Sequence, residues 1–420
     1  MKYSDGLWLN KPGYGVNYAT QMYEVTAAEN SINVLATAQW IGNRGQTLGG
    51  PVLEISFTST LENTIKVTVD HFKGRIKKAP AFELNEDASF KPTIKDTGSA
   101  FELISGNTRV VVAKGGAWDI KYYYGDKLLT KQGWRTTSYI NEEQWRTNER
   151  MNEDVMKQFF AHDETADGAV MRDMMNISVG ESIYGFGEKF STFVKNGQTV
   201  EVWNNDGGTS SEQSYKSIPF YVSSRSYGLF VNHPEKVSFE VASETVSKVA
   251  FTVQGEHLEY FVIGGGKIAD VLKVYTDLTG KPALTPAYTF GLWLTTSFTT
   301  DYDEKTVSSF IDGMAELDLT LEVFHFDCFW MKENEWCGFE WDKDMFPDVE
   351  GMLERMHQKG LKICVWINPY LAQHSAAFDE AADKGYLLKK PNGDIWQWDL
   401  WQAGLAVVDF TNPEAVEWYQ

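Results

Sequence analysis

Three apolar segments alternate with two amphipathic ones between residues 289 and 369, and no other feature restricts the fold of this chain so strongly. The apolar segments are TFGLWLT (289–295), LEVFHFD (321–327) and LKICVWINP (361–369). Strands that alternate with helices are typical of a parallel sheet covered by helices, because a crossover between parallel strands is long enough to hold a helix. The segments are apolar almost throughout, so we expect strands that are buried on both faces.

The segments between these strands carry apolar residues at helical spacing. They are Val307, Phe310, Ile311, Met314 and Leu317 in residues 303–319, and Val349, Met352, Leu353 and Met356 in residues 348–360. Asp348 and Gly360 are of the residue types that begin and end helices. We therefore predict two helices, each with one face against the sheet. Further helices are expected over 268–280 and after Asn412, where Pro413 takes the first helical position.

Residues 1 to about 265 have a different rhythm, with short alternating segments separated by Gly, Asn, Asp and Lys turns. The segments are SINVLATAQW, VLEISFTS, IKVTVDHF, TRVVVAKG, WDIKYYYG, PFYVSSRSYGLFVNH, VSFEVAS and KVAFTVQG. Many short strands without a long helical pattern predict a β-sandwich or a barrel-like domain. A purely structural role for this domain is the alternative that the pattern leaves open.

The size, charge and cysteines of the chain limit its class. A chain of 420 residues is too long for one core, so we expect two or three domains. The net charge of −20 argues against nucleic acid or an anionic membrane surface as partner, since both require a basic face. The three cysteines, Cys328, Cys337 and Cys364, form no Cys-x-x-Cys pair, and no apolar segment has the length of a signal peptide core or a membrane span. We expect a cytoplasmic protein, and no cofactor or metal is implied.

Polar side chains and large rings occur together just after each predicted strand. The three strand ends are Thr295-Thr296-Ser297-Phe298, Asp327-Cys328-Phe329-Trp330 and Trp366-Ile367-Asn368-Pro369. In a parallel barrel the active site lies at the carboxyl ends of the strands. Rings offer flat faces to the C–H side of a pyranose, and carboxylates and amides bind its hydroxyls. This combination indicates a sugar site, and the sequence has no Gly-rich phosphate loop, nucleophile elbow or metal-spaced His pair.

Each candidate residue also has a structural interpretation. Asp327 is of a type that often caps a loop at a strand end. Phe329 and Trp366 would be ordinary barrel filling in the alternative view. Cys328 is more often an inert core residue than a nucleophile, and no His-Asn relay lies nearby in the sequence. The loop at 200–220 is either a mobile surface loop or a segment that lends Asp206 to the site.

Several motifs, in this order, resemble those of glycoside hydrolase family 31, and within it most resemble the bacterial α-xylosidases. They are IYGFGEKF (183–190), NGQTVEVWNNDGGTS (196–210), IPFYVSSRSYGLFVNHP (218–234), FGLWLTTSFT (290–299), HFDCFWM (325–331), FPD (346–348) and KICVWINPY (362–370). The resemblance runs along nearly the whole chain. It implies a galactose mutarotase-like β-sandwich over residues 1–265, followed by the first half of a (β/α)8 TIM barrel over residues 266–420. A complete barrel takes roughly 250 residues, so we expect this chain to be the front part of a longer one.

The resemblance also implies a mechanism and a set of sugar-binding residues. The family cleaves α-glycosidic bonds with retention, through an Asp nucleophile and an Asp acid/base. The nucleophile of the family follows the fourth barrel strand, in a motif of the type Lys-Thr-Asp-Phe-Gly-Glu that is absent from this sequence. We therefore assign no catalytic residue to this chain and expect that it cannot turn over substrate alone. The residues to which the resemblance assigns substrate binding are Asp206, Phe298, Asp327, Cys328, Phe329 and Trp366.

The resemblance further implies that Cys328 and Phe329 carry the selectivity, because this pair is similar to the α-xylosidase version of the motif. A ring at this position would crowd the C5 hydroxymethyl group of glucose, whereas xylose has no such group. Rejection of one group of this size is worth only about 1–3 kcal/mol, so we expect a strong but not absolute preference for xylosides.

The expected function is release of α-linked xylose from oligosaccharides, such as the ends of xyloglucan fragments, by double displacement. One alternative is an α-glucosidase or transglycosidase of the same family, and another is a non-catalytic carbohydrate-binding fragment. The expected partner is a neutral oligosaccharide or α-xyloside, and a homo-oligomer of the full-length protein is left open.

Overall fold

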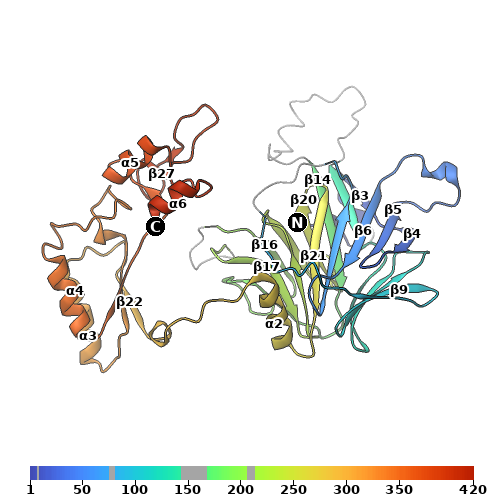
Figure 1. The fold of residues 1–420 in the computed structure, drawn as a ribbon, viewed down its shortest axis with the longest axis horizontal. Coiled ribbons are helices and arrows are strands. Elements are labelled where there is room, and N and C mark those ends of the chain that lie inside the picture. Colours follow the sequence, from blue (N-terminus) through green and yellow to red (C-terminus); the bar gives the residue numbers. More distant parts are fainter. Residues whose placement is uncertain (7–8, 75–80, 143–167, 206–212) are drawn as a thin grey trace. The chain divides into compact units, whose positions relative to one another are not determined.

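The chain folds into two compact units, Met1–Lys281 and Pro282–Gln420, in the computed structural model (Figure 1). The structure describes residues 1–6, 9–74, 81–142, 168–205 and 213–420.

The first unit is an antiparallel β-sandwich, as its alternating segments predict. In the described residues one sheet has the strand order β15-β17-β18-β21-β7-β6-β5-β4 and a second has the order β16-β19-β20-β14-β13-β3. The first sheet contains β4 (Gln21–Ala27), β5 (Ile32–Thr37), β6 (Val52–Thr58), β7 (Thr64–Asp70), β15 (Ile183–Gly187), β17 (Ser217–Ser223), β18 (Tyr227–Val231) and β21 (His257–Gly264). The second contains β3 (Tyr14–Tyr18), β13 (Ser138–Glu142), β14 (Ala169–Asn176), β16 (Gln198–Val202), β19 (Val237–Val241) and β20 (Lys248–Gln254).

Two smaller sheets complete the strands of this unit in the described ranges. One has the order β12-β11-β10-β9-β8 and consists of β8 (Thr93–Asp96), β9 (Ala100–Ser105), β10 (Thr108–Ala113), β11 (Ile120–Tyr124) and β12 (Lys127–Gln132). The other is the short pair β1 (Ser4–Asp5) and β2 (Leu9–Asn10), and a 3₁₀ turn, η1 (Arg44–Thr47), precedes β6.

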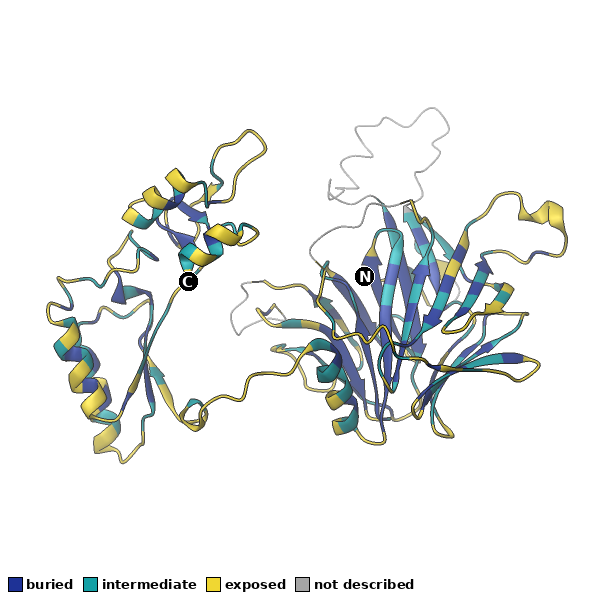
Figure 2. Cartoon of the chain, viewed as in Figure 1, coloured by how far each residue is buried: buried dark blue, intermediate teal, exposed yellow. Residues whose placement is uncertain are grey.

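Alternation of side chains across the strands builds the core of the sandwich. In β6, Leu53, Ile55 and Phe57 are buried, whereas Glu54 and Ser56 face the other side. Burial of one such apolar side chain is worth about 1.5–3 kcal/mol relative to exposure. The buried cluster draws on strands of all three larger sheets, whose inner faces are the dark regions of Figure 2.

Helix α2 (Ile268–Thr279) belongs to the first unit. Its Val271 is fully buried, and the ring of Tyr275 stacks on Phe220 of β17 with ring centroids 3.9 Å apart. The boundary between the compact units therefore follows this helix, and the division expected at residue 265 lies on its amino-terminal side.

The second unit contains the predicted parallel sheet. Strands β22 (Trp293–Thr295), β23 (Val323–Phe326) and β24 (Lys362–Val365) are adjacent in that order, and both pairings are parallel. Helices α3 (Glu304–Glu316) and α4 (Val349–Gln358) connect them, and a 3₁₀ turn, η2 (Ala287–Phe290), precedes β22. Asp303 and Asp348 cap the two helices through their side chains, the second as predicted. The alternation of strand and helix is thus confirmed, and one face of each helix is exposed in Figure 2.

The burial of these strands differs from the expectation. Val323, Phe324 and Phe326 of β23 are buried, but Trp293 of β22 and Lys362 of β24 are exposed. The reason is that β22 and β24 form the two edges of this sheet in the described residues, so fewer atoms cover them than cover the central strand.

The remaining elements of the second unit were predicted only in part. Asn412 caps helix α6 (Pro413–Tyr419) as expected, with its side chain accepting the N–H of Glu414 at 3.0 Å. Helix α5 (Ala376–Lys384) and a small antiparallel sheet were not predicted. The sheet consists of β25 (Tyr370–Leu371), β27 (Leu405–Val407) and β26 (Gln397–Trp398), in that order. Over the ranges described, none of the helices combines the length and apolarity needed to cross a bilayer.

Candidate functional site

The carboxyl ends of the three parallel strands lie side by side at one end of the sheet. Thr296, Asp327 and Trp366 are each the first residue after their strand. Backbone hydrogen bonds continue the ladder to these positions, because Thr296 N–H donates to the carbonyl of His325 (3.2 Å) and Trp366 N–H to the carbonyl of Phe326 (2.8 Å). The sheet therefore brings together polar and aromatic residues that lie far apart in the sequence.

Asp327 is held in place by hydrogen bonds with its neighbours. Its backbone N–H donates to Thr296 Oγ1 (2.9 Å), and its carbonyl accepts the hydroxyl of Tyr302 (2.6 Å). Its Oδ1 accepts the N–H of Cys328 (2.7 Å) and caps the 3₁₀ turn η3 (Cys328–Trp330). Among the described residues no ion pair engages this half-buried carboxylate, and the side chain of Cys328 makes a further hydrogen bond with it. Asp327 thus caps a turn, as the structural interpretation held, and its carboxylate stays partly accessible.

Cys328 is the first residue of this turn. It is 2% exposed, and burial together with the negative charge of Asp327 raises the pKa of its thiol to about 12. The thiol therefore stays protonated at neutral pH and cannot serve as a nucleophile.

Three aromatic rings at or near the ends of β23 and β24 form a connected set. The Phe329 and Trp336 rings meet edge to face with centroids 5.4 Å apart, and the Trp336 and Trp366 rings do so at 5.8 Å. The carbonyl of Trp366 accepts the indole N–H of Trp330 (2.8 Å), which fixes the backbone at this strand end. Phe329 and Trp366 are half-buried, so their rings are partly accessible rather than sealed in the core. Trp336 joins two residues that the sequence had placed in the site, but it was not itself predicted.

The other two predicted residues are placed differently. Phe298 follows the end of β22 and is 54% exposed, and its ring meets Trp401 edge to face at 6.1 Å. Asp206 lies outside the described residues, so its expected contribution to the site stays a prediction.

His325 precedes the site on β23. Its Nδ1 lies 2.7 Å from Thr295 Oγ1 on the neighbouring strand. Burial lowers the pKa of this imidazole and outweighs the opposite effect of the Asp327 charge, so the ring is neutral at pH 7. His325 acts here as a hydrogen-bonded strand residue.

Two models of protein families match the chain. The glycosyl hydrolase 31 N-terminal galactose mutarotase-like domain matches residues 53–240, and the glycosyl hydrolases family 31 TIM-barrel domain matches residues 282–420. The chain belongs to glycoside hydrolase family 31. The expected fold, a mutarotase-like sandwich followed by part of a TIM barrel, is confirmed.

The curated relatives differ in how much of the chain they match and in their sequence identity to it. The chain is 46% identical to alpha-xylosidase XylQ of Lactiplantibacillus pentosus and 43% identical to an alpha-xylosidase of Emericella nidulans, in both cases over its whole length. It covers 52% and 53% of those two proteins, so it spans about half the length of the curated relatives it matches. Identity to alpha-glucosidase 2 of Bacillus thermoamyloliquefaciens is 27%, over 57% of this chain and 31% of that protein.

Solved structures of the family share the fold but not the substrate. A dextranase of Flavobacterium johnsoniae complexed with glucose has a TM-score of 0.74 at 21% identity, covering 96% of this chain and 45% of that chain. An alpha-xylosidase from a soil metagenome complexed with xylose has a TM-score of 0.66 at 19% identity, covering 94% of this chain and 54% of that one. The fold alone therefore does not choose between these sugars.

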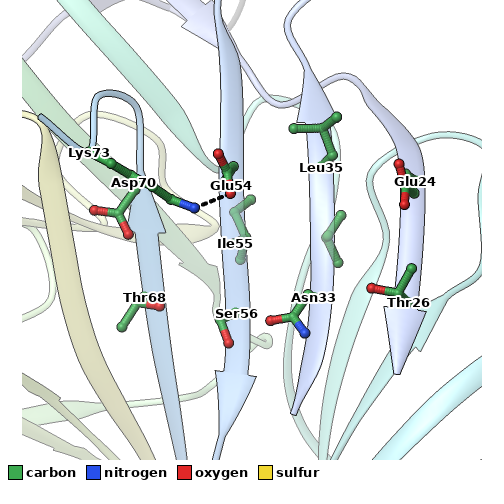
Figure 3. A pocket seen from close by; sticks show the side chains of 11 residues that line it. Glu24, Thr26, Asn33, Leu35, Glu54, Ile55, Ser56, Thr68, Asp70 and Lys73 are labelled. Carbon is green, nitrogen blue, oxygen red and sulfur yellow. Dashed lines mark hydrogen bonds and ion pairs between the residues drawn. The ribbon is translucent and has the colours of Figure 1, made fainter. Parts of the chain in front are cut away.

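A concave surface in the first unit contains none of the predicted residues. It holds about 430 Å³ on the outer face of β4 to β7, between the side chains of Glu24, Asn33, Glu54, Asp70 and others (Figure 3). Its side chains are mainly polar, Lys73 is paired with Glu54, and no aromatic ring lines it. We assign no sugar site there. Within the described ranges, no group of three or more His, Cys, Asp or Glu is placed to hold a metal ion.

Two features of the site had only weak signals in the sequence. Trp336 belongs to WCGFEWD (336–342), a segment rich in rings and acids that follows HFDCFWM. Gln402 is 3% exposed, and its Oε1 accepts the backbone N–H of Trp336 at 3.2 Å, so the segment between β26 and β27 is tied to the ring set. Neither residue stands at a strand end, which was the signal used to find the others.

Proposed function

We propose that this chain forms the sugar-binding part of a retaining α-xylosidase of family 31. One observation carries the proposal: identity to two α-xylosidases is high along the entire chain, whereas identity to an α-glucosidase is lower and covers little more than half of it. The substrate class is α-linked xylosides at the ends of neutral oligosaccharides.

The geometry at the strand ends supports this role. In this proposal the half-buried carboxylate of Asp327 accepts hydroxyl groups of the sugar, while its Oδ1 also accepts the Cys328 N–H. The Phe329, Trp336 and Trp366 rings offer a partly accessible aromatic wall for the C–H face of the sugar. In this proposal Phe329 stands beside C5, Cys328 is the buried first residue of the turn that carries Phe329, and Asp206 is a further substrate-binding carboxylate.

Chemistry in this proposal comes from two carboxylates that we do not assign to any residue of the chain. In retaining glycosidases one carboxylate attacks the anomeric carbon while the other protonates the leaving oxygen and then activates water. The residues of this chain would bind and orient the sugar for that attack. Its three cysteines are free, which supports the proposed cytoplasmic location. We propose assembly into a homo-oligomer only for the full-length protein.

Comparison of two chromogenic substrates tests the function. The protein expressed from the full reading frame that contains this chain should hydrolyse p-nitrophenyl α-xyloside with a kcat/KM about 10- to 200-fold higher than the α-glucoside. A preference for the glucoside would instead favour the α-glucosidase or transglycosidase alternative. Sugar binding without turnover of either substrate would favour the non-catalytic alternative.

Replacing Phe329 with alanine tests the origin of the preference. Loss of the ring should raise the kcat/KM for α-glucoside relative to α-xyloside by about tenfold, because the hydroxymethyl group then has room. The matched control is Phe339→Ala, since Phe339 lies on the same loop but packs on Tyr419, with centroids 5.6 Å apart. An unchanged ratio in Phe329→Ala would remove Phe329 as the selectivity residue.

A further inference from the structure

Trp401 combines an exposed ring with an unfavourable backbone conformation. Its side chain is 55% exposed, although it is one of the largest apolar residues of the second unit. Its φ is +66°, in the left-handed region that bulky residues rarely adopt. Such a conformation costs about 1–3 kcal/mol and tends to persist at ligand-binding positions. Trp401 is therefore an exposed residue and not part of the buried core of the second unit.

The segment around Trp401 is held rigidly at the site. Asp399 Oδ1 accepts the N–H of Gly404 (3.0 Å), and the Gln397 side chain donates to the carbonyl of Gly404 (2.8 Å). Gln402, the next residue after Trp401, accepts from the backbone of Trp336. A ring presented on a loop that is already ordered loses little entropy when it binds a ligand.

Trp401 also contacts a predicted site residue. Its ring lies edge to face with that of Phe298, which follows the end of β22 and is itself 54% exposed. Two half-exposed rings therefore stand together at the strand ends. The rings of Phe329, Trp336 and Trp366 are less exposed and contact one another edge to face.

The two groups of rings differ in exposure, so they suit two different parts of a substrate. A terminal xylosyl residue fits the more enclosed rings, whereas the sugar to which it is linked must extend toward solvent. We propose that Trp401 and Phe298 form an aromatic platform for the hexopyranose on the leaving-group side of the scissile bond. The inference rests on the proposed function and assigns the leaving-group side of the same site.

The test compares two substrates that share the xylosyl group. An α-xylosyl-glucose disaccharide would contact the platform, whereas α-xylosyl fluoride has a leaving group too small to do so. In Trp401→Ala, the ratio of kcat/KM for the disaccharide to that for the fluoride should fall by about tenfold or more. Trp401→Phe keeps a ring and should restore most of this ratio.

Trp398→Ala is the matched control, because Trp398 is also 55% exposed and lies on β26 of the same segment, with its ring against Trp396. It should leave the ratio as in the wild type. An equal loss on both substrates in Trp401→Ala, or the same change of ratio in both alanine variants, would overturn the platform. Failure of the proposed function has a different signature, namely a wild-type protein that turns over glucosyl but not xylosyl substrates. The ratio for a glucosyl disaccharide and glucosyl fluoride would then decide on the platform in the same way.

Discussion

Replacing Asp327 with alanine is expected to lower kcat/KM for an α-xyloside by about a hundredfold or more, measured in the protein expressed from the full reading frame. The half-buried carboxylate forms no ion pair in the described residues, so its charge can accept hydrogen bonds from the hydroxyl groups of the substrate. Hydrogen bonds to a charged acceptor are worth about 1.5–3 kcal/mol each, and their loss leaves buried hydroxyls unpaired.

Asp327 also stabilises a turn, and the experiment must separate this role from substrate binding. Oδ1 caps the turn η3, and loss of a helix cap costs about 1 kcal/mol of stability. Asp327→Asn keeps an oxygen for the Cys328 N–H but removes the charge, so it should retain stability and still lose most of the activity. Asp303→Ala is the capping control, since Asp303 accepts the Thr306 N–H at 2.8 Å at the start of α3. It should lower stability without a comparable loss of kcat/KM. If kcat/KM fell less than tenfold in Asp327→Ala, capping of the turn would be the only role left for Asp327.

The sequence predicted the part of this site that depends on strand ends. Apolar segments marked the three strands, and the carboxyl ends of parallel strands meet at one edge of a sheet. Asp327, Phe329 and Trp366 could therefore be grouped before any coordinates were known. The same signal placed Phe298 at the site, although its ring contacts Trp401 rather than the rings around Asp327.

Residues held by irregular backbone escaped that signal. Trp336 and Trp401 lie in segments without periodicity. Trp401 also has a positive φ, which cannot be predicted from its residue type. The strands β25 to β27 have two or three residues each, too few to show alternation. The position of helix α2 also depended on contacts, because its amphipathic pattern shows that it packs but not on which unit it packs.

The first unit contains a buried ion pair whose loss should have the largest effect on stability. Arg172 on β14 and Glu244, between β19 and β20, have side chains that are 0% and 2% exposed, and they are directly paired. Glu244 Oε1 also accepts the backbone N–H groups of Tyr3 (3.0 Å) and Ser4 (2.7 Å). Burial by itself would raise the pKa of Glu244, but the charge of Arg172 and the hydrogen bonds from Arg172 and Ser4 outweigh it and hold this pKa below 4.5.

Replacing Glu244 with alanine should destabilise this unit by about 3–5 kcal/mol, because it leaves the Arg172 charge buried without a partner. Hydrogen exchange of the β14, β19 and β20 amides in the whole chain measures the effect, with helix α4 of the second unit as internal reference. The surface pair Lys216–Glu188, whose side chains are 70% and 68% exposed, provides the control. Glu188→Ala should change stability by no more than about 1 kcal/mol.

The pH dependence and a double variant distinguish pairing from packing at Glu244. The stabilisation by its charge should be complete above pH 4.5 and should be lost as the pH falls through the lower pKa of the folded state. The reason is that the carboxyl of the unfolded chain takes up its proton at a higher pH than the carboxyl of the folded chain. Glu244→Gln should lack this acid-dependent loss. Replacing Arg172 with methionine and Glu244 with leucine together should recover much of the stability lost in Glu244→Ala, since two apolar side chains leave no charge unpaired. If the double variant were as unstable as Glu244→Ala, the defect would lie in packing around Tyr3 and Ser4 rather than in the uncompensated charge of Arg172.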